Sequence, residues 1–198
     1  AASLPPDVRF FPFYLREAGY YCTNNSKTDY QMSKMPKDVW DESSSSAHWK
    51  NRAQGQPFFA VFNVPGTHES TINANEESFA RLTLALKPEE RQNPDSLDLP
   101  PYYPDTPAAR RDWANHYELV TALDYRISRI LDELDEDGAA EDTIVVFWSD
   151  HGIGLPRAKR WLYDSGTRVP FIVYIPEKFR HLRPAEPGAV VDRLVNSL

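Results

Sequence analysis

Apolar residues recur at two spacings along the chain, and these spacings predict alternating helices and strands. Between Trp113 and Leu134 they lie three and four residues apart, which predicts an amphipathic helix that ends near Gly138. Short continuous apolar runs predict strands buried on both faces, at residues 57–63, 143–148 and 169–175. Helices that alternate with such strands indicate an α/β fold.

The remaining segments are less regular. Residues 7–18 carry apolar positions at helical spacing, with Pro12 expected to kink the helix or to mark its first turn. Residues 31–56, which include four consecutive serines, are predicted to form a surface loop with one short helix. Six prolines in residues 87–108 predict an extended connecting segment outside the core. We interpret residues 1–198 as one partial domain with these two segments as loops or insertions.

Composition and charge remove several classes of protein. The chain has 22 basic and 29 acidic residues, a net charge of -7 that disfavours nucleic acids and anionic membranes as partners. Its single cysteine, Cys22, cannot form an internal disulfide. No apolar stretch reaches the roughly 18 residues of a membrane span. The chain starts without methionine and stops in a run typical of a helix beginning, so we expect a fragment cut at both ends.

A carboxylate and an imidazole stand side by side directly after the predicted strand 143–148. They belong to Asp150 and His151, and Gly152 after them permits a tight turn. Ligands gather at the carboxyl ends of strands in open α/β sheets, and oxygen and nitrogen donors of this kind bind divalent cations. The same two residues are also compatible with a turn cap and a surface histidine, and the motif alone does not decide.

Three further positions offer groups that bind anions or move protons. His68 follows the strand 57–63 and is either a proton donor to a leaving group or a loop histidine. Lys27 lies in a turn rich in Asn and Ser, beyond the apolar residues 20–22. A loop after His151 holds three cations, Arg157, Lys159 and Arg160. These cations either face an anionic substrate or form a solvated surface.

The order of these motifs resembles the type I sulfatases of the alkaline phosphatase superfamily, and within them the heparan N-sulfatase-like branch. The resemblance covers nearly the whole chain. It rests on Asn-Ser-Lys-Thr-Asp-Tyr at 25–30, Asp-His-Gly at 150–152, and Lys-x-x-x-Tyr-x-x-Gly-x-Arg-Val-Pro at 159–170. It implies an alkaline phosphatase-like αβα sandwich with a mostly parallel central sheet, incomplete at both ends of this chain.

The resemblance also implies a role for each candidate residue. Asp150 and His151 would be ligands of one divalent cation, usually Ca²⁺ in sulfatases. Lys27 and Lys159 would bind the sulfate oxygens, and His68 would face the leaving group. A cation and two ammonium groups offset the charge that builds on sulfate oxygens in the transition state. The implied activity is hydrolysis of a sulfate ester or sulfamate on a sulfated glycan such as a heparan-type saccharide, in the periplasm, the exterior or a lysosome.

The sequence departs from the sulfatase pattern at the nucleophile. Sulfatases use a formylglycine made in a Cys/Ser-x-Pro/Ala-x-Arg motif, together with two further metal-binding aspartates, all N-terminal to the region seen here. Cys22 lacks both the Pro or Ala and the Arg, and no serine fits the motif. Many sulfatases have a histidine where this chain has Asp29. We therefore expect a central segment that is inactive alone, within a parent protein that is a sulfatase.

Two other functions stay open at this point. A phosphodiesterase or phosphonate hydrolase of the same superfamily would use zinc ions and a serine or threonine nucleophile. Its extra ligands would have to come from the remaining histidines, His48, His116 and His181. A non-catalytic protein that binds sulfated glycans would need no nucleophile. The sequence does not name the exact substrate or the oligomeric state.

Overall fold

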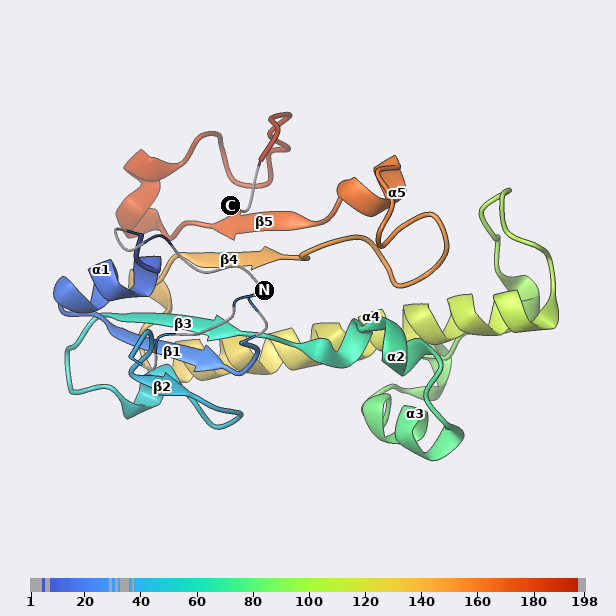
Figure 1. The fold of residues 1–198 in the computed structure, drawn as a ribbon, viewed down its shortest axis with the longest axis horizontal. Coiled ribbons are helices and arrows are strands. Elements are labelled where there is room, and N and C mark those ends of the chain that lie inside the picture. The colour runs from blue at the N-terminus through green and yellow to red at the C-terminus, as the bar shows by residue number, and fades with distance from the viewer. Residues whose placement is uncertain are drawn as a thin grey trace. The chain divides into compact units, whose positions relative to one another are not determined.

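The computed structural model describes residue 5, residues 8–28, residues 30, 32 and 36, and residues 38–195. Two compact units divide the chain, one of residues 1–64 and one of residues 65–198. The helices and strands are labelled in Figure 1. In chain order they are α1 (Phe11–Glu17), β1 (Tyr21–Asn25), β2 (Glu42–Ser43), β3 (Phe58–Phe62), α2 (Glu69–Ile72), α3 (Glu76–Leu82), α4 (Pro107–Glu136), β4 (Val145–Trp148), α5 (Asp164–Thr167) and β5 (Phe171–Tyr174).

A parallel sheet forms the centre of the N-terminal unit. β1 lies between β2 and β3 and runs in the same direction as both (Figure 1). Cys22 pairs with Phe59, which sets the register of β1 on β3. The apolar run at 57–63 therefore forms a strand as predicted, but all five residues of β3 are only half-buried. The three central residues of β1 are the buried ones.

The segment 31–56 contains one short helix, as predicted, but its described residues do not all lie at the surface. It contains β2 and a 3₁₀ turn, Trp49–Asn51, and the Trp49 side chain is only 2% exposed. The Trp49 ring stacks on Phe58 at 5.6 Å and meets Phe62 edge-on at 5.4 Å. An aromatic residue from this segment thus packs on β3. A single residue provides the contact, so the sequence contains no periodic hydrophobic pattern that would predict it.

The first helix begins later than its apolar pattern suggested. α1 spans Phe11–Glu17, whereas the prediction was 7–18, and Asp7 lies outside the described residues. Pro12 occupies the first turn, as one of the two predicted alternatives, because a residue there needs no intrahelical N–H bond. Gly19 follows in the left-handed conformation at φ 90° and donates its N–H to the Arg16 carbonyl at 2.9 Å.

The long helix α4 organises the second unit. It runs for 30 residues, and the Thr106 side chain caps its start by accepting the Ala109 N–H at 3.2 Å. The prediction of a helix ending near Gly138 is confirmed, and the helix starts earlier, at Pro107. Among the described residues, no helix has both the length and the apolar character needed to cross a membrane. On α4, Trp113 and Leu119 join a core cluster with Ile72 and Leu155.

The proline-rich segment 87–108 has no buried residue, as expected of a connector, but three of its side chains pack against this core. Leu97, Leu99 and Tyr103 pack against the cluster. Prolines instead start two 3₁₀ turns, Pro88–Glu90 and Pro94–Ser96. Proline prevents a long helix or a central strand, but it does not prevent a segment from covering a core in short turns.

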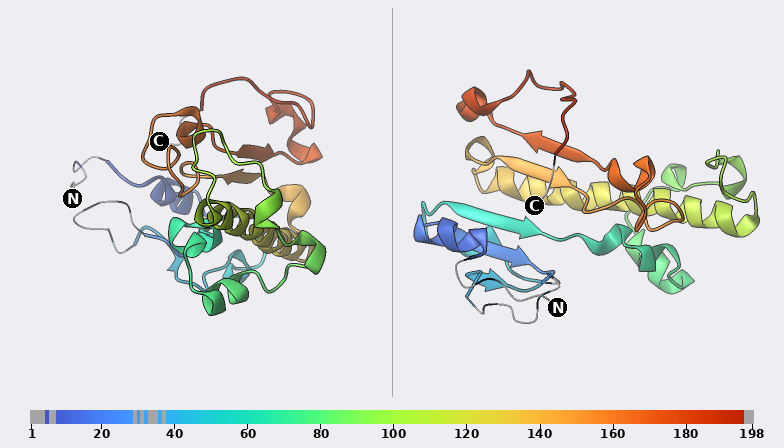
Figure 2. Two further views of the ribbon diagram at one scale, coloured as in Figure 1. Left: turned by 90° about the vertical axis from the view of Figure 1, so that its right-hand side faces the viewer. Right: turned by 45° about the horizontal axis from the view of Figure 1, so that its top comes forward.

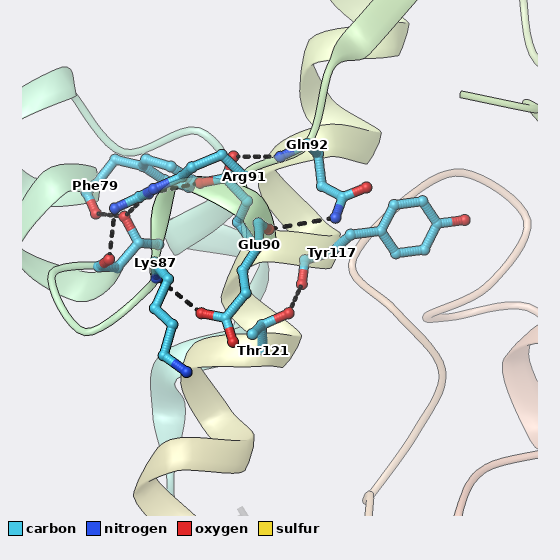
Figure 3. A network of polar contacts seen from close by, with 9 residues as sticks. Phe79, Lys87, Glu90, Arg91, Gln92, Tyr117 and Thr121 are labelled. Atoms are coloured by element: carbon cyan, nitrogen blue, oxygen red, sulfur yellow. Dashed lines mark hydrogen bonds and ion pairs between the residues drawn. The ribbon is translucent and has the colours of Figure 1, made fainter. Parts of the chain in front are cut away.

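A polar network ties this segment to α3 and α4 (Figure 3). Arg91 donates to Glu118 Oε2 at 2.7 Å and to the Thr83 hydroxyl and carbonyl oxygens at 2.7 Å each. Glu118 also accepts the Gln92 backbone N–H at 3.0 Å, and its side chain is only 11% exposed. A carboxylate with this little contact to water needs all of these partners.

Replacing Glu118 with glutamine is expected to lower the free energy of unfolding by about 2 kcal/mol, because hydrogen bonds to a charged group are lost around Arg91. Urea unfolding of the full-length protein measures this change. Glu77→Gln is the matched control, since the ion pair of Glu77 with Arg81 is exposed and i,i+4. The control substitution is expected to lower the free energy of unfolding by less than about 0.5 kcal/mol. Equal losses in the two variants would contradict the structural role given to Glu118.

β4 and β5 form the second sheet, and it is antiparallel. Trp148 pairs with Phe171 and Val145 with Tyr174, and the two arrows point in opposite directions in Figure 1. Both strands were predicted from their apolar runs, but neither is buried on both faces. Trp148 is 47% exposed and Ile172 is 60% exposed. An apolar run specifies a strand but neither its direction nor how much of it other elements cover.

His116 makes stability depend on pH. Its Nδ1 is buried without a hydrogen-bond partner in the described part of the chain, and burial lowers its pKa. The unfolded chain therefore takes up this proton near the ordinary pKa of about 6.5, while the folded protein does so only at lower pH. Stability should fall as pH drops below about 6.5, by up to about 1.4 kcal/mol per pH unit from this group. His116→Phe should flatten that slope in urea unfolding, and an unchanged slope would show that other groups cause it.

Candidate functional site

Three candidate residues of the second unit, Asp150, His151 and Lys159, lie in the loop that follows β4. Figure 2 shows the chain leaving β4, making a wide loop, forming α5 and returning as β5. The Ser149 N–H donates to the Pro170 carbonyl at 3.2 Å, and the Gly152 N–H donates to the Gly166 carbonyl at 3.1 Å. The loop therefore closes on itself just beyond the strand ends, where the sequence predicted a ligand site.

Asp150 and His151 are brought together with their donor atoms facing each other. His151 Nε2 lies 3.5 Å from Asp150 Oδ2, and the Asp150 side chain is 67% exposed. His151 Nδ1 lies 2.7 Å from the Gly152 carbonyl oxygen, which can only accept a hydrogen bond. In the neutral ring the proton is therefore on Nδ1 and the lone pair is on Nε2. This tautomer presents a nitrogen lone pair beside a carboxylate.

This arrangement suits a divalent cation. Two lone-pair donors at 3.5 Å repel each other unless a proton or a cation lies near both, and a backbone carbonyl on the other ring nitrogen is the usual orienting partner of a metal-binding histidine. Within the described residues no group of three or more His, Cys, Asp and Glu side chains is placed to hold a metal. The described residues thus offer two donor side chains here, and the role of Asp150 and His151 as metal ligands stays a prediction.

His68 stands at the start of α2 with one ring nitrogen engaged. Its Nδ1 accepts the Ser70 backbone N–H at 3.3 Å and lies 2.8 Å from the Ser70 hydroxyl. The neutral ring therefore carries its proton on Nε2. The side chain is exposed. A proton donor to a leaving group is an imidazolium ring, in which Nδ1 would donate to the Ser70 hydroxyl and Nε2 would donate to the leaving group.

Glu69 connects the start of α2 to the cationic loop. Its two carboxylate oxygens accept from Arg160 at 3.0 and 2.9 Å, and one lies 3.5 Å from Lys159 Nζ. The hydrogen bond from Arg160, and then the charges of Arg160 and Lys159, hold the Glu69 pKa below its ordinary value. The Lys159 side chain is only 17% exposed. Lys159 is therefore more than a solvated surface charge, whereas the Arg160 side chain is 66% exposed although it is paired.

Close backbone contacts hold these segments together. A Cβ on Gly152 would lie 2.1 Å from the Ser165 carbonyl oxygen, and one on Gly154 would lie 2.3 Å from Glu69 Cβ. Gly166 would place a Cβ 2.2 Å from the Trp161 carbonyl oxygen. Glycine is required at all three positions because any side chain would push the backbones apart. The contact at Gly154 brings the loop after β4 against the residue that follows His68.

Lys27 lies in the first unit, in an exposed turn after β1. The buried Asn24 side chain donates to the Lys27 carbonyl at 2.9 Å and accepts from Asn63 Nδ2 at 2.9 Å. Two strand ends of the parallel sheet therefore fix the turn that carries Lys27. Asp29, at the position where many sulfatases have histidine, lies outside the described residues. The binding of sulfate oxygens by Lys27 stays a prediction.

Cys22 is unsuited to nucleophilic chemistry, in agreement with its lack of the formylglycine motif. The side chain is 0% exposed in the middle of β1. Burial, with a smaller effect from the charge of Asp41, raises the pKa of its thiol to about 11. A thiol that stays protonated at neutral pH is a poor nucleophile.

Sequence reasoning missed Glu69 and the roles of the three glycines. Glu69 follows His68 directly, but its partners Lys159 and Arg160 lie about ninety residues further along the chain. A single acidic residue in a short loop gives no signal for such a partner. The glycines were visible, but only Gly152 and Gly166 belonged to a motif, and the packing that requires them depends on the folded loop.

The comparisons with known proteins agree on one family. The family model for sulfatases matches residues 10–198. An ulvan-active sulfatase of Formosa agariphila is 40% identical over 199 residues, which cover 88% of this chain and 33% of that protein. The N-sulphoglucosamine sulphohydrolase of Homo sapiens is 45% identical over 106 residues, 52% of this chain and 20% of that protein. The iduronate 2-sulfatase of Mus musculus is 31% identical over 93 residues, 44% of this chain and 17% of that protein.

Fold and site together define the class: an α/β protein whose carboxylate, imidazole and ammonium groups follow a strand end. The chain belongs to the sulfatase family, because the family model covers nearly all of it. Its fold class is accordingly alkaline phosphatase-like α/β, as the sequence predicted. The chain spans about a third or less of the length of these curated relatives.

Proposed function

We propose that the protein to which this chain belongs hydrolyses a sulfate ester or sulfamate on a sulfated glycan. The support comes from the family and from the names of its relatives, which refer to ulvan, N-sulfoglucosamine and iduronate 2-sulfate. The observation that carries the proposal is the pairing of Asp150 and His151 at the end of β4, with Lys159 held in the same loop. These groups suit an anion bound next to a cation.

In this proposal Asp150 Oδ2 and His151 Nε2 are two ligands of one Ca²⁺, and further ligands come from outside the described residues. Calcium prefers oxygen ligands, so the histidine has to be a minority donor among carboxylates. When bound, the cation withdraws electron density from the sulfate oxygens and makes the sulfur a better electrophile. The Gly152 carbonyl keeps the lone pair of His151 directed at this position.

Lys159 and Lys27 bind sulfate oxygens in the same proposal, and the imidazolium form of His68 donates the proton on Nε2 to the departing oxygen or nitrogen and becomes neutral. Lys159 Nζ is 3.5 Å from Glu69, a distance at which it has hydrogen-bonding capacity left for a sulfate oxygen. A formylglycine is expected as the nucleophile, and its precursor motif does not occur among the 198 residues. The chain alone is therefore expected to be inactive.

Sulfate release by the full-length protein tests this function. N-sulfoglucosamine, a sulfated monosaccharide and 4-nitrophenyl sulfate are incubated with the protein and Ca²⁺, and free sulfate is measured. We expect release from at least one sugar substrate. No release from any of them, with the same protein hydrolysing a phosphodiester or a phosphonate, would replace the proposal by the superfamily alternative. Binding of sulfated glycans without turnover of either kind would support the non-catalytic alternative.

Removing the metal site should abolish this activity. Asp150→Asn loses the ligand charge and is expected to reduce kcat/KM by about 100-fold or more. It should also lose the increase in thermal stability that Ca²⁺ gives to the wild type. Asp164→Asn is the control, because Asp164 is exposed and forms only a 3.9 Å ion pair with Arg168. If Asp150→Asn keeps both the activity and the response to Ca²⁺, the assignment of Asp150 as a ligand is wrong.

A further inference from the structure

Beside Lys159 the loop presents aromatic rings to solvent. Trp161 is 57% exposed and Tyr163 is 46% exposed, and their rings stack with centroids 6.3 Å apart at an interplanar angle of 28°. Exposed aromatic side chains that cluster at a surface indicate a binding site, because they contribute little to packing there. Neither ring belongs to the core cluster of the second unit.

A guanidinium group borders this pair of rings. The Arg157 side chain lies over the Tyr163 ring at 4.1 Å and over the Tyr102 ring at 4.6 Å. Within the part of the chain that the structure describes, no carboxylate forms an ion pair with Arg157. Tyr102 is itself 43% exposed. The edge of the guanidinium is therefore available to an anionic group, while its faces rest on aromatic rings.

Several contacts fix the backbone that carries these groups. Arg157 and Arg160 have φ values of 66° and 74°, which non-glycine residues adopt only where the surroundings hold them. The two hydrogen bonds from Arg160 to Glu69 restrain one of them, and the Ser165 hydroxyl donates to the Arg157 carbonyl at 2.6 Å. A surface whose shape is fixed before binding loses less conformational entropy when a ligand arrives.

The chemistry of the surface selects one class of ligand. A pyranose ring has an apolar C–H face, which packs on an aromatic ring, and polar edges that stay in water. An acidic group on that sugar would meet Arg157. Lys159 lies between Arg157 and Trp161 in the sequence, and the inference takes a sulfate group at Lys159 as the neighbour of a sugar on these rings. A chain of acidic sugars meets all of these conditions, whereas a lone sulfated monosaccharide needs only the lysine.

We propose that Trp161, Tyr163 and Arg157 form a subsite for the acidic sugar that adjoins the sulfated unit of an oligosaccharide or polysaccharide substrate. The Trp161 ring binds the face of the sugar ring, Tyr163 supports Trp161 by stacking and Arg157 by its ring face, and Arg157 binds the carboxylate or sulfate of the sugar. This inference rests on the proposed function for the location of the sulfated unit. The three residues set the length and charge of the substrate and take no part in breaking the bond.

The test compares binding and turnover of a heparan sulfate tetrasaccharide and of N-sulfoglucosamine by the full-length protein. Trp161→Ala and Tyr163→Ala are each expected to weaken tetrasaccharide binding about 10-fold in calorimetry, since a stacking contact is lost. The ratio of kcat/KM for the tetrasaccharide to that for the monosaccharide should fall by about the same factor, through KM. Trp161→Phe, which keeps a ring, should restore most of the affinity even if the alanine variant folds poorly.

Leu162→Ala is the matched control. Leu162 lies between the two aromatic residues in the sequence and is 96% exposed. The substitution therefore removes apolar surface from the same loop without removing a ring. It should change neither affinity nor the ratio. A loss equal to that of Trp161→Ala would mean that the loop binds through apolar area alone and would overturn the stacking subsite. Unchanged tetrasaccharide binding in both aromatic variants would overturn it as well.

Arg157→Gln separates the acidic contact from stacking. It should weaken binding of the tetrasaccharide, and its effect should disappear with a tetrasaccharide whose carboxylates are reduced and whose N-sulfates are replaced by acetyl groups. An equal loss with both ligands would contradict the contact with an acidic group. Calorimetry needs no turnover, so a protein that binds the tetrasaccharide through these residues but releases no sulfate would refute the proposed function and leave the subsite standing. A wild type that binds no tetrasaccharide would refute the subsite.

Discussion

Alanine at position 152 should disable the site and destabilise the second unit. The new Cβ would lie 2.1 Å from the Ser165 carbonyl oxygen and 2.9 Å from Gly166 Cα, both of them backbone atoms. The loop has to open at this point, which breaks the 3.1 Å hydrogen bond from Gly152 to Gly166. We expect a loss of about 3 kcal/mol in the free energy of unfolding from overpacking. Displacement of Asp150 and His151 by about 1 Å should cost about 100-fold in kcat/KM.

Urea unfolding and sulfate release by the full-length protein measure the two effects. Gly66→Ala is the control, because its Cβ would meet no atom within 4 Å and its backbone conformation suits alanine. The control is expected to change stability by less than about 0.5 kcal/mol. A Gly152→Ala variant with the stability and the activity of Gly66→Ala would show that the loop after β4 is not closed as the structure has it.

Replacing Lys159 with alanine should remove most of the sulfate-binding charge without unfolding the protein. Lys159 contributes one long contact, 3.5 Å to Glu69, whereas Arg160 makes the two shorter bonds that hold the loop. We expect kcat to fall by about 100- to 1,000-fold, as when a single group that stabilises transition-state charge is deleted. Inhibition by free sulfate should weaken in parallel, because in the proposed function the same ammonium group binds the sulfate product.

Lys178→Ala is the control, since Lys178 forms an exposed ion pair with Asp142 and lies outside the loop. It should keep full activity. Lys159→Arg should recover part of the rate, because it keeps the charge but not the compact ammonium geometry. If Lys159→Ala loses less than about 3-fold in kcat, the group does not act on the transition state.

The fold could be predicted where many residues contribute to the same hydrophobic pattern. The helix from Trp113 to Leu134 repeats its apolar spacing over several turns, and a run of apolar residues predicts each of β3, β4 and β5. β2 has only two residues and pairs with β1 through Thr23 and Asn24, which is too short for any period to show. The antiparallel direction of β5 depends on where the loop returns, and an apolar run contains no such information.

The site could be predicted as far as its polar residues follow strands. Asp150, His151 and Lys159 lie after β4, as the sequence motif and the predicted strand 143–148 indicated. Their partners could not be predicted, because Glu69 reaches Arg160 through a contact 91 residues away in sequence. The left-handed conformations of Arg157 and Arg160 were equally invisible, since nothing in an arginine side chain favours them and only the folded loop imposes them.

The closed loop after β4 also bears on how such proteins can diversify. Its ends are held by the bond between Ser149 and Pro170, so residues inserted beside Leu162, which is 96% exposed, can leave the register of the strands unchanged. Doubling the length of a flexible loop costs only about 0.6 kcal/mol. Insertions beside the exposed Leu162 would therefore alter what the protein binds at little cost to folding. Relatives are expected to differ in substrate preference first at this position, and last at Asp150 and His151.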